Sequence, residues 1–174
     1  VSEANVYYPF ADIVWRGDPI GDRYAQISDL MGSAMQRGAN QLRGSQEVTV
    51  DVEVARFHSV TEKARYTVGG VHSIWFFLTV TDAETGEIIA PWRLVHADMM
   101  ALAGKEAMRA DSEGQTMRVR IEDHLSEIIV QELSRPIAVA AVEAAPDPLD
   151  GEAPTQAALE NPEGPPAEAG ALEL

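Results

Sequence analysis

Alternating apolar and polar positions mark the clearest strand of this chain. Valine occupies every even position from 48 to 54, and polar residues stand between the valines. A period of two places the valines on one buried face of a strand and the polar side chains in water, as in an antiparallel sheet. The pattern inverts before Phe57, which is odd-numbered, so we predict a strand over 48–58 with a β-bulge near Ala55.

Two further strands are predicted downstream. Residues 71–81 alternate again, with large apolar side chains at the even positions, and a third strand follows over 87–97. The intervening DAETG at 82–86 has the composition of a turn, in which Gly86 can adopt a positive φ. Because Pro91 cannot donate an amide hydrogen bond, the third strand is expected at an edge of the sheet or with a bulge.

Apolar residues spaced three and four apart predict two helices, over 22–43 and 115–135. Asp18 or Asp22 can cap the start of the first helix, and Pro136 ends the second. The predicted apolar stripe of the first helix consists of Tyr24, Ile27, Met31, Ala34 and Met35. In the second helix Met117, Ile121, Leu125, Ile128 and Glu132 mark successive turns, and Ile129 and Leu133 widen the apolar stripe.

Together these elements predict a two-layer α+β fold, in which two helices pack on an antiparallel sheet of three to four strands. A short helix over 105–111 fits between the third strand and the last helix. Residues 1–20 are expected to form an extended segment packed on the domain, and residues 21–137 the single α+β domain. Residues 138–174 are rich in Ala, Pro and Glu and contain no aromatic residue, so we expect a disordered acidic tail.

The charge of the chain is acidic and unevenly distributed. The net charge is −15, and the segment from Glu143 onward holds eight acidic residues and no basic one. The first 142 residues contain 20 acidic and 13 basic residues, a net charge of −7. Nucleic acid is not expected as a partner, because phosphate binding needs a basic face.

Several kinds of chemistry lack their sequence signatures. Cysteine is absent, which excludes disulfides, thiol catalysis and cysteine-ligated metals. The four histidines show no metal-binding spacing, and no G-x-S-x-G elbow is present. The Gly69–Gly70 pair lacks the rest of a phosphate-binding motif and is interpreted as a turn. We therefore expect no catalytic residues, no metal and no cofactor. The sequence contains no run of 18 apolar residues, so it predicts no membrane-spanning helix.

The connection between the first two strands is the main candidate for a binding site. Because these strands should pair, it brings five side chains to one end of the sheet: Arg56, His58, Arg65, Tyr66 and His72. Such a cluster could bind an anion or an acidic partner. It could instead hold the connection in place through buried hydrogen bonds.

Aromatic residues away from the core face are the other binding candidates. Trp75 lies on the opposite face of its strand from Ile74 and Phe76, and large aromatic residues in such places often mark a binding surface. Trp15 and Arg16, in the N-terminal segment, are binding candidates as well. The alternative is that this segment covers the same face of the sheet.

Three segments carry a resemblance to a known family: VSEANVYYPFADIVWRGDPIGDR at the start, RFHSVTEKARYTVGGVHSIWFFLTVTDAETGE in the middle and GQTMRVRIEDHLSEIIVQEL near the end. Over residues 1–135 the chain resembles an uncharacterised family of alphaproteobacterial envelope lipoproteins. The resemblance implies a removed signal peptide and a lipidated cysteine upstream of Val1, and a position on the periplasmic side of the envelope, anchored in the outer membrane. It implies no activity. The order of elements is also similar to that of small α/β domains in other outer-membrane lipoproteins, including the curli-secretion type, which is a likeness of fold alone.

Our main hypothesis is a non-enzymatic envelope domain that binds a protein partner, self-associates or acts in envelope assembly. It would touch a membrane only through its lipid anchor. The alternatives are a hydrolase that uses Asp12, Asp18 or His58 and a small module that binds an anionic ligand with Arg56 and Arg65. An enzyme would need an acid and a base that converge in one concave pocket.

Overall fold

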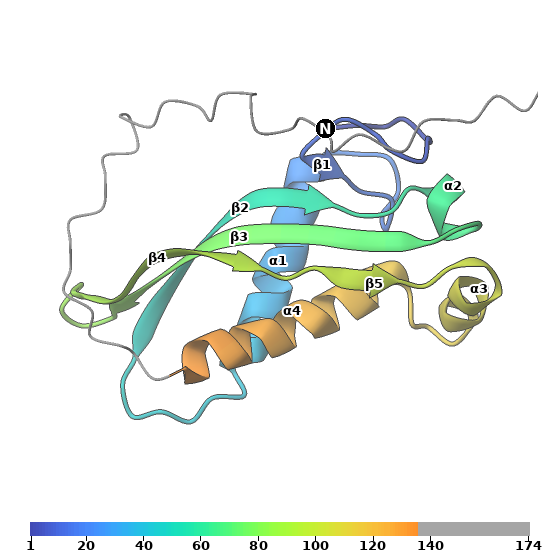
Figure 1. The fold of residues 1–174 in the computed structure, drawn as a ribbon. Helices are drawn as coiled ribbons and strands as arrows, with labels where there is room; N and C mark the ends of the chain where they lie inside the picture. The colour runs from blue at the N-terminus through green and yellow to red at the C-terminus, as the bar shows by residue number, and fades with distance from the viewer. Residues whose placement is uncertain (136–174) are drawn as a thin grey trace, which may run out of the picture. The chain divides into compact units, whose positions relative to one another are not determined.

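Five strands form one open, mostly antiparallel sheet in the computed structural model, which describes residues 1–135 (Figure 1). They are β1 (Ile13–Val14), β2 (Val48–His58), β3 (Gly70–Asp82), β4 (Ile88–His96) and β5 (Met99–Ala101). Their order is β1-β2-β3-β4, and β5 pairs with the first residues of β3, beyond the end of β4. β1 runs parallel to β2, whereas the other pairs are antiparallel. The tail predicted over 138–174 lies outside the described residues.

Four helices accompany the sheet within residues 1–135: α1 (Arg23–Ala39), α2 (Glu62–Arg65), α3 (Gly104–Ser112) and α4 (Met117–Ser134). α1 and α4 pack together on one face of the sheet, and α2 and α3 lie at the end where β5 pairs with β3 (Figure 1). This arrangement confirms the predicted two-layer α+β fold. The short helix expected over 105–111 is α3. The periodicity of the sequence did not predict β1, β5 or α2, which are only two to four residues long.

The predicted β-bulge in β2 is confirmed. Val54 pairs with Phe76, but Arg56 pairs with Trp75, so Ala55 is the extra residue on the β2 side of the ladder. Because side chains alternate along a strand, the extra residue reverses the face on which every later side chain lies.

That reversal decides which residues of β2 join the core. Val50, Val52 and Val54 before the bulge pack against the core, and Phe57 after it is fully buried. Arg56 and His58 therefore turn to the opposite side of the sheet, where they pair with Trp75 and Ser73. We call this side the open face, because α1 and α4 both lie on the other side (Figure 1).

The core fills the space between the sheet and the two long helices. Its buried side chains alternate along β3 and recur at helical spacing on the helices: Ile74, Phe76, Leu78 and Val80 on β3, Ile27, Leu30, Met31 and Ala34 on α1, and Met117, Ile121, Leu125 and Ile129 on α4. Burial of one large apolar side chain contributes about 1.5–3 kcal/mol, so this layer supplies the main stabilisation of the fold.

Both helical stripes differ in detail from the predicted ones. Tyr24 is 66% exposed, and Leu30 is the fully buried residue that the predicted stripe of α1 omitted. In α4, Ile129 is fully buried, in agreement with its place in the predicted stripe, whereas Ile128, predicted at the centre of the stripe, is only half-buried. The contact between α1 and α4 determines these details, and the periodicity of a single helix cannot reveal such a contact.

Gly38 makes that contact possible. A Cβ atom at this position would lie 1.8 Å from Cγ2 of Ile129 and 2.6 Å from the carbonyl oxygen of Ser126. Real Cβ atoms do not approach other atoms so closely, so a residue larger than glycine would push the helices apart.

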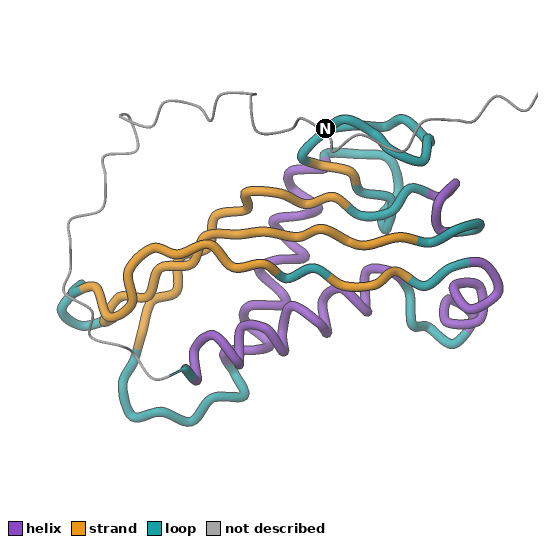
Figure 2. Tube along the Cα trace, viewed as in Figure 1, coloured by secondary structure: helices purple, strands orange, loops and turns teal. Residues whose placement is uncertain are grey.

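The N-terminal segment is mostly loop and folds back on the domain beside the end of β2 (Figure 2). The hydroxyl of Thr61 donates a hydrogen bond of 2.7 Å to the carbonyl oxygen of Val6, and the amide of Lys63 donates one of 2.8 Å to Asn5 Oδ1. These bonds attach the first residues of the chain to the start of α2. Asp22 then caps α1, as predicted, by accepting from the amides of the next turn.

Candidate functional site

The five side chains predicted to cluster do lie at one end of the sheet, but on two sides of it. Arg56 and His58 are on the open face. His72 is buried on the helix side, where Arg65 lines the same small cavity. Tyr66 follows α2 and is 49% exposed, with the guanidinium of Arg65 5.8 Å from its ring centre.

Trp75 is held in a fixed position on the open face. Its ring lies 4.8 Å from that of His96, and the guanidinium of Arg56 lies 5.6 Å from its centre. Asp98 fills the break between β4 and β5: its Oδ1 accepts hydrogen bonds from the amide of Ile74, at 2.9 Å, and from Trp75 Nε1, at 3.0 Å. The indole is therefore oriented by a carboxylate that also completes the strand pairing.

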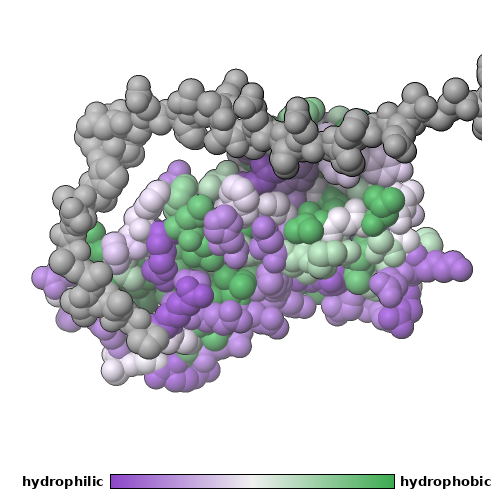
Figure 3. Space-filling view, viewed as in Figure 1, coloured by the Kyte–Doolittle hydropathy of each residue, from purple (hydrophilic) through white to green (hydrophobic). Residues whose placement is uncertain are grey.

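A second aromatic pair lies further along the open face. The rings of Phe77 and Trp92 stack with their centres 4.1 Å apart and their planes 15° from parallel. Trp92 is 56% exposed, and Leu94, which pairs with Phe77, is 41% exposed. We call this set the aromatic strip: Trp75, Phe77, Trp92, Leu94 and His96. In Figure 3, apolar surface is visible over the strands between polar side chains.

His58 lies beside the strip. Its Nδ1 is 2.9 Å from Nη2 of Arg56, and Nη1 of Arg56 is 3.7 Å from a carboxylate oxygen of Asp12. Burial, and after it the positive charge of Arg56, lower the pKa of His58, while Asp12 opposes them. A neutral His58 can accept the hydrogen bond from Arg56, which holds the guanidinium against the ring of Trp75.

A groove of about 870 Å³ opens at the far end of the sheet, between the start of β2, β4 and the ends of α1 and α4. Apolar side chains contribute much of its lining: Leu42, Val50, Val80, Ile89 and Leu133. Trp92 lines it too, so the groove adjoins the aromatic strip at the edge strand β4. Pro91 lies in this edge strand, as predicted, where the pairing with β3 is irregular.

The rim of the groove is basic. Arg43, Arg93 and Arg135 line it together with one carboxylate, that of Glu132. Arg93 and Arg135 share Glu132, at 3.2 and 2.9 Å, and Arg43 bonds to backbone carbonyl oxygens. The rim therefore has an excess of positive charge on a domain that is acidic as a whole.

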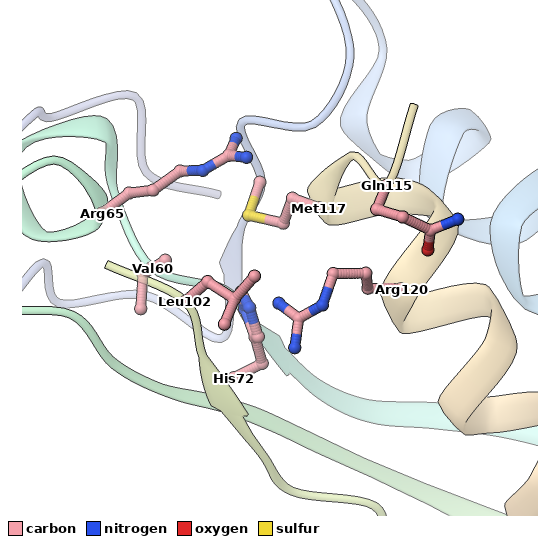
Figure 4. A pocket seen from close by; sticks show the side chains of 7 residues that line it. All are labelled: Val60, Arg65, His72, Leu102, Gln115, Met117 and Arg120. Atoms are coloured by element: carbon pink, nitrogen blue, oxygen red, sulfur yellow. The ribbon is translucent and has the colours of Figure 1, made fainter. Parts of the chain in front are cut away.

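The cavity on the helix side is small, with a volume of about 10 Å³ (Figure 4). His72, which is 1% exposed, lines it from β3, and Arg120 reaches it from α4. Burial lowers the pKa of His72 to about 4, with smaller contributions from the positive charges of Arg120 and Arg65 and from His124. His72 is therefore neutral at neutral pH.

Trp15 and Arg16 attach the N-terminal segment to the domain. Trp15 is fully buried against Phe57, with ring centres 5.5 Å apart, and its Nε1 donates a 2.8 Å hydrogen bond to Asp18. Arg16 pairs with Glu3. Trp15 therefore lies in the helix-side core and not over the face that carries Trp75.

Gly69 adopts a φ of +75°, as the interpretation as a turn requires. Its amide donates to the carbonyl oxygen of Ala64, at 2.8 Å, and is therefore not available to a ligand.

Across residues 1–135, we find no group of three His, Asp or Glu side chains arranged to hold a metal ion. No helix in the same range is both long and apolar enough to cross a membrane.

The sequence pattern did not identify Phe77, Trp92, Leu94 or His96 as site residues. A signal was present, since Phe77 shares the face of Trp75 in a strand, and the even positions 92, 94 and 96 share one face of the next strand. What the sequence could not supply is the register that sets the two series side by side.

The fold and these surfaces define a small α+β domain whose sheet is covered by helices on one face and carries an aromatic strip on the other. The chain belongs to a family of unknown function, DUF6778, whose pattern matches residues 1–146. Comparison with curated proteins and with solved structures gave no match. The view that this family consists of envelope lipoproteins stays a prediction from the resemblance.

Proposed function

We propose that this chain is a non-enzymatic interaction domain that binds a protein partner through the aromatic strip and the adjoining groove. The observation that carries the proposal is the stacked pair of Phe77 and Trp92 on the open face. Exposed aromatic residues that lie next to one another supply most of the binding energy in many protein interfaces.

The aromatic strip is suited to binding because it is already ordered. Trp75 is fixed by Asp98, His96 and Arg56, and Trp92 is fixed by Phe77. Side chains that keep one conformation before and after binding lose little conformational entropy in the complex. Little of the binding free energy from burial of this apolar area would therefore be lost in ordering these side chains.

The groove indicates the chemistry of the partner. Its apolar lining fits a segment with exposed apolar side chains, and its basic rim favours an acidic residue next to that segment. A volume of about 870 Å³ is large enough for several side chains. We therefore propose a partner segment in which apolar residues are flanked by Asp or Glu.

The geometry gives less support to a hydrolase. Asp18 accepts hydrogen bonds from Trp15 and from Arg118, at 2.8 and 2.6 Å, so its carboxylate is engaged. Neither Asp12 nor His58 lines the groove or the small cavity. The anion-binding alternative based on Arg56 and Arg65 is also weakened, because these two side chains lie on different sides of the sheet.

We further propose that the domain works on the periplasmic side of the cell envelope, attached to the outer membrane by a lipid. This rests on the resemblance to envelope lipoproteins alone. The test is to label cells that express the natural gene with radioactive palmitate and to fractionate them. Label in the protein and its recovery with the outer membrane are expected, and recovery of unlabelled protein with the cytosol would contradict the proposal.

The role of the aromatic strip is tested with Trp92→Ala, using Tyr24→Ala as the matched control. Both residues are exposed and aromatic, but Tyr24 lies on α1, away from the strip. The tagged natural protein is cross-linked in its own cells, and the co-purified proteins are quantified. The recovered amount of at least one co-purified protein should fall by about tenfold with Trp92→Ala, which corresponds to a loss of about 1.4 kcal/mol in binding free energy. The same amount should stay unchanged with Tyr24→Ala.

Sedimentation of the purified chain shows whether the partner is a second copy. In that case wild type and Tyr24→Ala should dimerise and Trp92→Ala should stay monomeric. Identical sets of co-purified proteins for the three chains, with no difference in sedimentation, would contradict a binding role of the strip.

A further inference from the structure

The small cavity on the helix side has an unusual excess of hydrogen-bond donors. In Figure 4 the guanidinium of Arg120 points toward the imidazole of His72, and Arg65 reaches in from α2. Gln115 also contributes to the lining, and Val60, Leu102 and Met117 supply the apolar part. The one carboxylate that binds a cavity residue, Asp111, is already paired with Arg65.

Among the buried and half-buried arginines of residues 1–135, Arg120 differs from the others because it has no carboxylate partner in this range. Seven arginines within residues 1–135 are buried or half-buried. Six of them pair with a carboxylate: Arg16, Arg23, Arg56, Arg65, Arg93 and Arg118. Arg120 makes neither an ion pair nor a side-chain hydrogen bond to any described residue. A half-buried guanidinium without a counter-charge is unfavourable, because it loses hydration and gains no compensating contact.

Two buried histidine nitrogens near Arg120 also have no hydrogen-bond partner among residues 1–135. They are Nδ1 of His72 and Nε2 of His124. His124 follows Arg120 by one helical turn on α4, and both side chains influence His72. Each of these nitrogens can carry a proton and donate a hydrogen bond, depending on the tautomer. Arg120, Arg65 and, in the suitable tautomer, His72 therefore offer donors to this cavity, which is an environment that favours an anion.

We propose that this cavity binds one small monovalent anion of the size of chloride, held by the guanidinium of Arg120 and by Nδ1–H of His72. A volume of about 10 Å³ accommodates a group about as large as a water molecule, so tetrahedral oxyanions such as phosphate and sulfate are too large. The anion gives Arg120 its missing counter-charge and gives His72 an acceptor. It thereby links α4 to β3 on the side of the sheet away from the aromatic strip. This site is independent of the proposed protein-binding function.

The charged and titratable groups around the site set its dependence on conditions. Arg120, Arg65 and a protonated His72 favour the anion, and Asp111 opposes it, although its charge is offset by Arg65. An anion that accepts from His72 stabilises the protonated imidazole, so affinity for chloride should rise as the pH falls.

Binding is measured on the 174-residue chain by the line width of the ³⁵Cl NMR signal and by thermal unfolding. Sodium chloride replaces sodium gluconate at constant ionic strength. We expect a saturable broadening and a rise of several degrees in Tm for the wild type. Arg120→Gln should lose both effects. Arg109→Gln is the matched control, because Arg109 is an exposed arginine on α3 and should keep both.

Crystals of the wild-type chain soaked in sodium bromide give a test that does not require the variants to fold. An anomalous peak between Arg120 and His72 is the expected result. The proposal is overturned if saturating bromide leaves only a water molecule in the cavity. It is also overturned if chloride broadens the signal of Arg120→Gln as much as that of the wild type, or broadens neither.

Discussion

Buried polar side chains impose the strongest constraints at the scale of single residues. His72 is almost completely buried, with a pKa near 4 and no protein acceptor for Nδ1 among residues 1–135. An imidazole that is neutral when folded and protonates readily when unfolded makes stability depend on pH. The groups that face it are Arg65, Arg120 and His124, with Asp111 beyond Arg65.

The domain should therefore lose stability as the pH falls from about 6.5 toward 4. The folded-state pKa of His72, about 4, is below its usual value of 6.5, so in this window the unfolded chain binds more protons. The loss attributable to His72 approaches about 3 kcal/mol at the acid end. Urea unfolding of the wild type, in chloride-free buffer at several pH values, should show this slope. His72→Gln should flatten it.

If the slope of His72→Gln equals that of the wild type, other groups cause the acid sensitivity and the assignment to His72 is wrong.

The position of His72 relative to Arg56 and His58 was only partly predictable from the sequence. The sequence located Arg56, His58 and His72 at one end of the sheet and also predicted the bulge at Ala55. The consequence, that the bulge moves Arg56 and His58 to the face opposite His72, requires the register of β2 against β3.

At the scale of elements, the packing of α1 against α4 decides the shape of the helix layer. The point of contact is Gly38, which meets the side chain of Ile129. Considered in one helix alone, glycine lowers stability by about 1 kcal/mol relative to alanine. In this pair of helices its missing side chain is what allows the contact.

Gly38→Ala should destabilise the domain by about 1–3 kcal/mol, because its Cβ would overlap Ile129 and Ser126. Gly32→Ala is the control on the same helix. A Cβ at Gly32 meets nothing within 4 Å, so this change should stabilise by about 0.5–1 kcal/mol. Urea unfolding of both variants measures the two effects. Stabilisation by Gly38→Ala would show that the helices do not pack as described.

The long elements were predictable because each carries enough repeats of its own pattern. β2 has the predicted bounds of 48–58, and β3, β4, α1 and α4 were placed within a few residues of their true ends. β1 and β5 have no such pattern. β1 exists because Ile13 and Val14 pair with β2, and β5 because Asp98 fills the break after β4 and lets pairing with β3 resume.

At the scale of the whole domain, the two faces of the sheet have different roles. The helix side contains the core, and the open face carries the aromatic strip, which continues around β4 into the groove. From the sequence, Trp75 was the only member of the strip proposed as a contact residue. The others could not be selected, because a strand pattern shows which residues share a face but not which strands are neighbours.

The central claim is that the open face of this domain contacts another protein in the cell. The most direct measurement is photo-cross-linking with benzoylphenylalanine placed at Leu94, in the aromatic strip, and separately at Gln36, an exposed position on α1. If the claim is correct, position 94 gives a discrete protein adduct in cells that express the natural protein, and position 36 gives no such adduct. Equal adducts from both positions, or an adduct from position 36 alone, would contradict it.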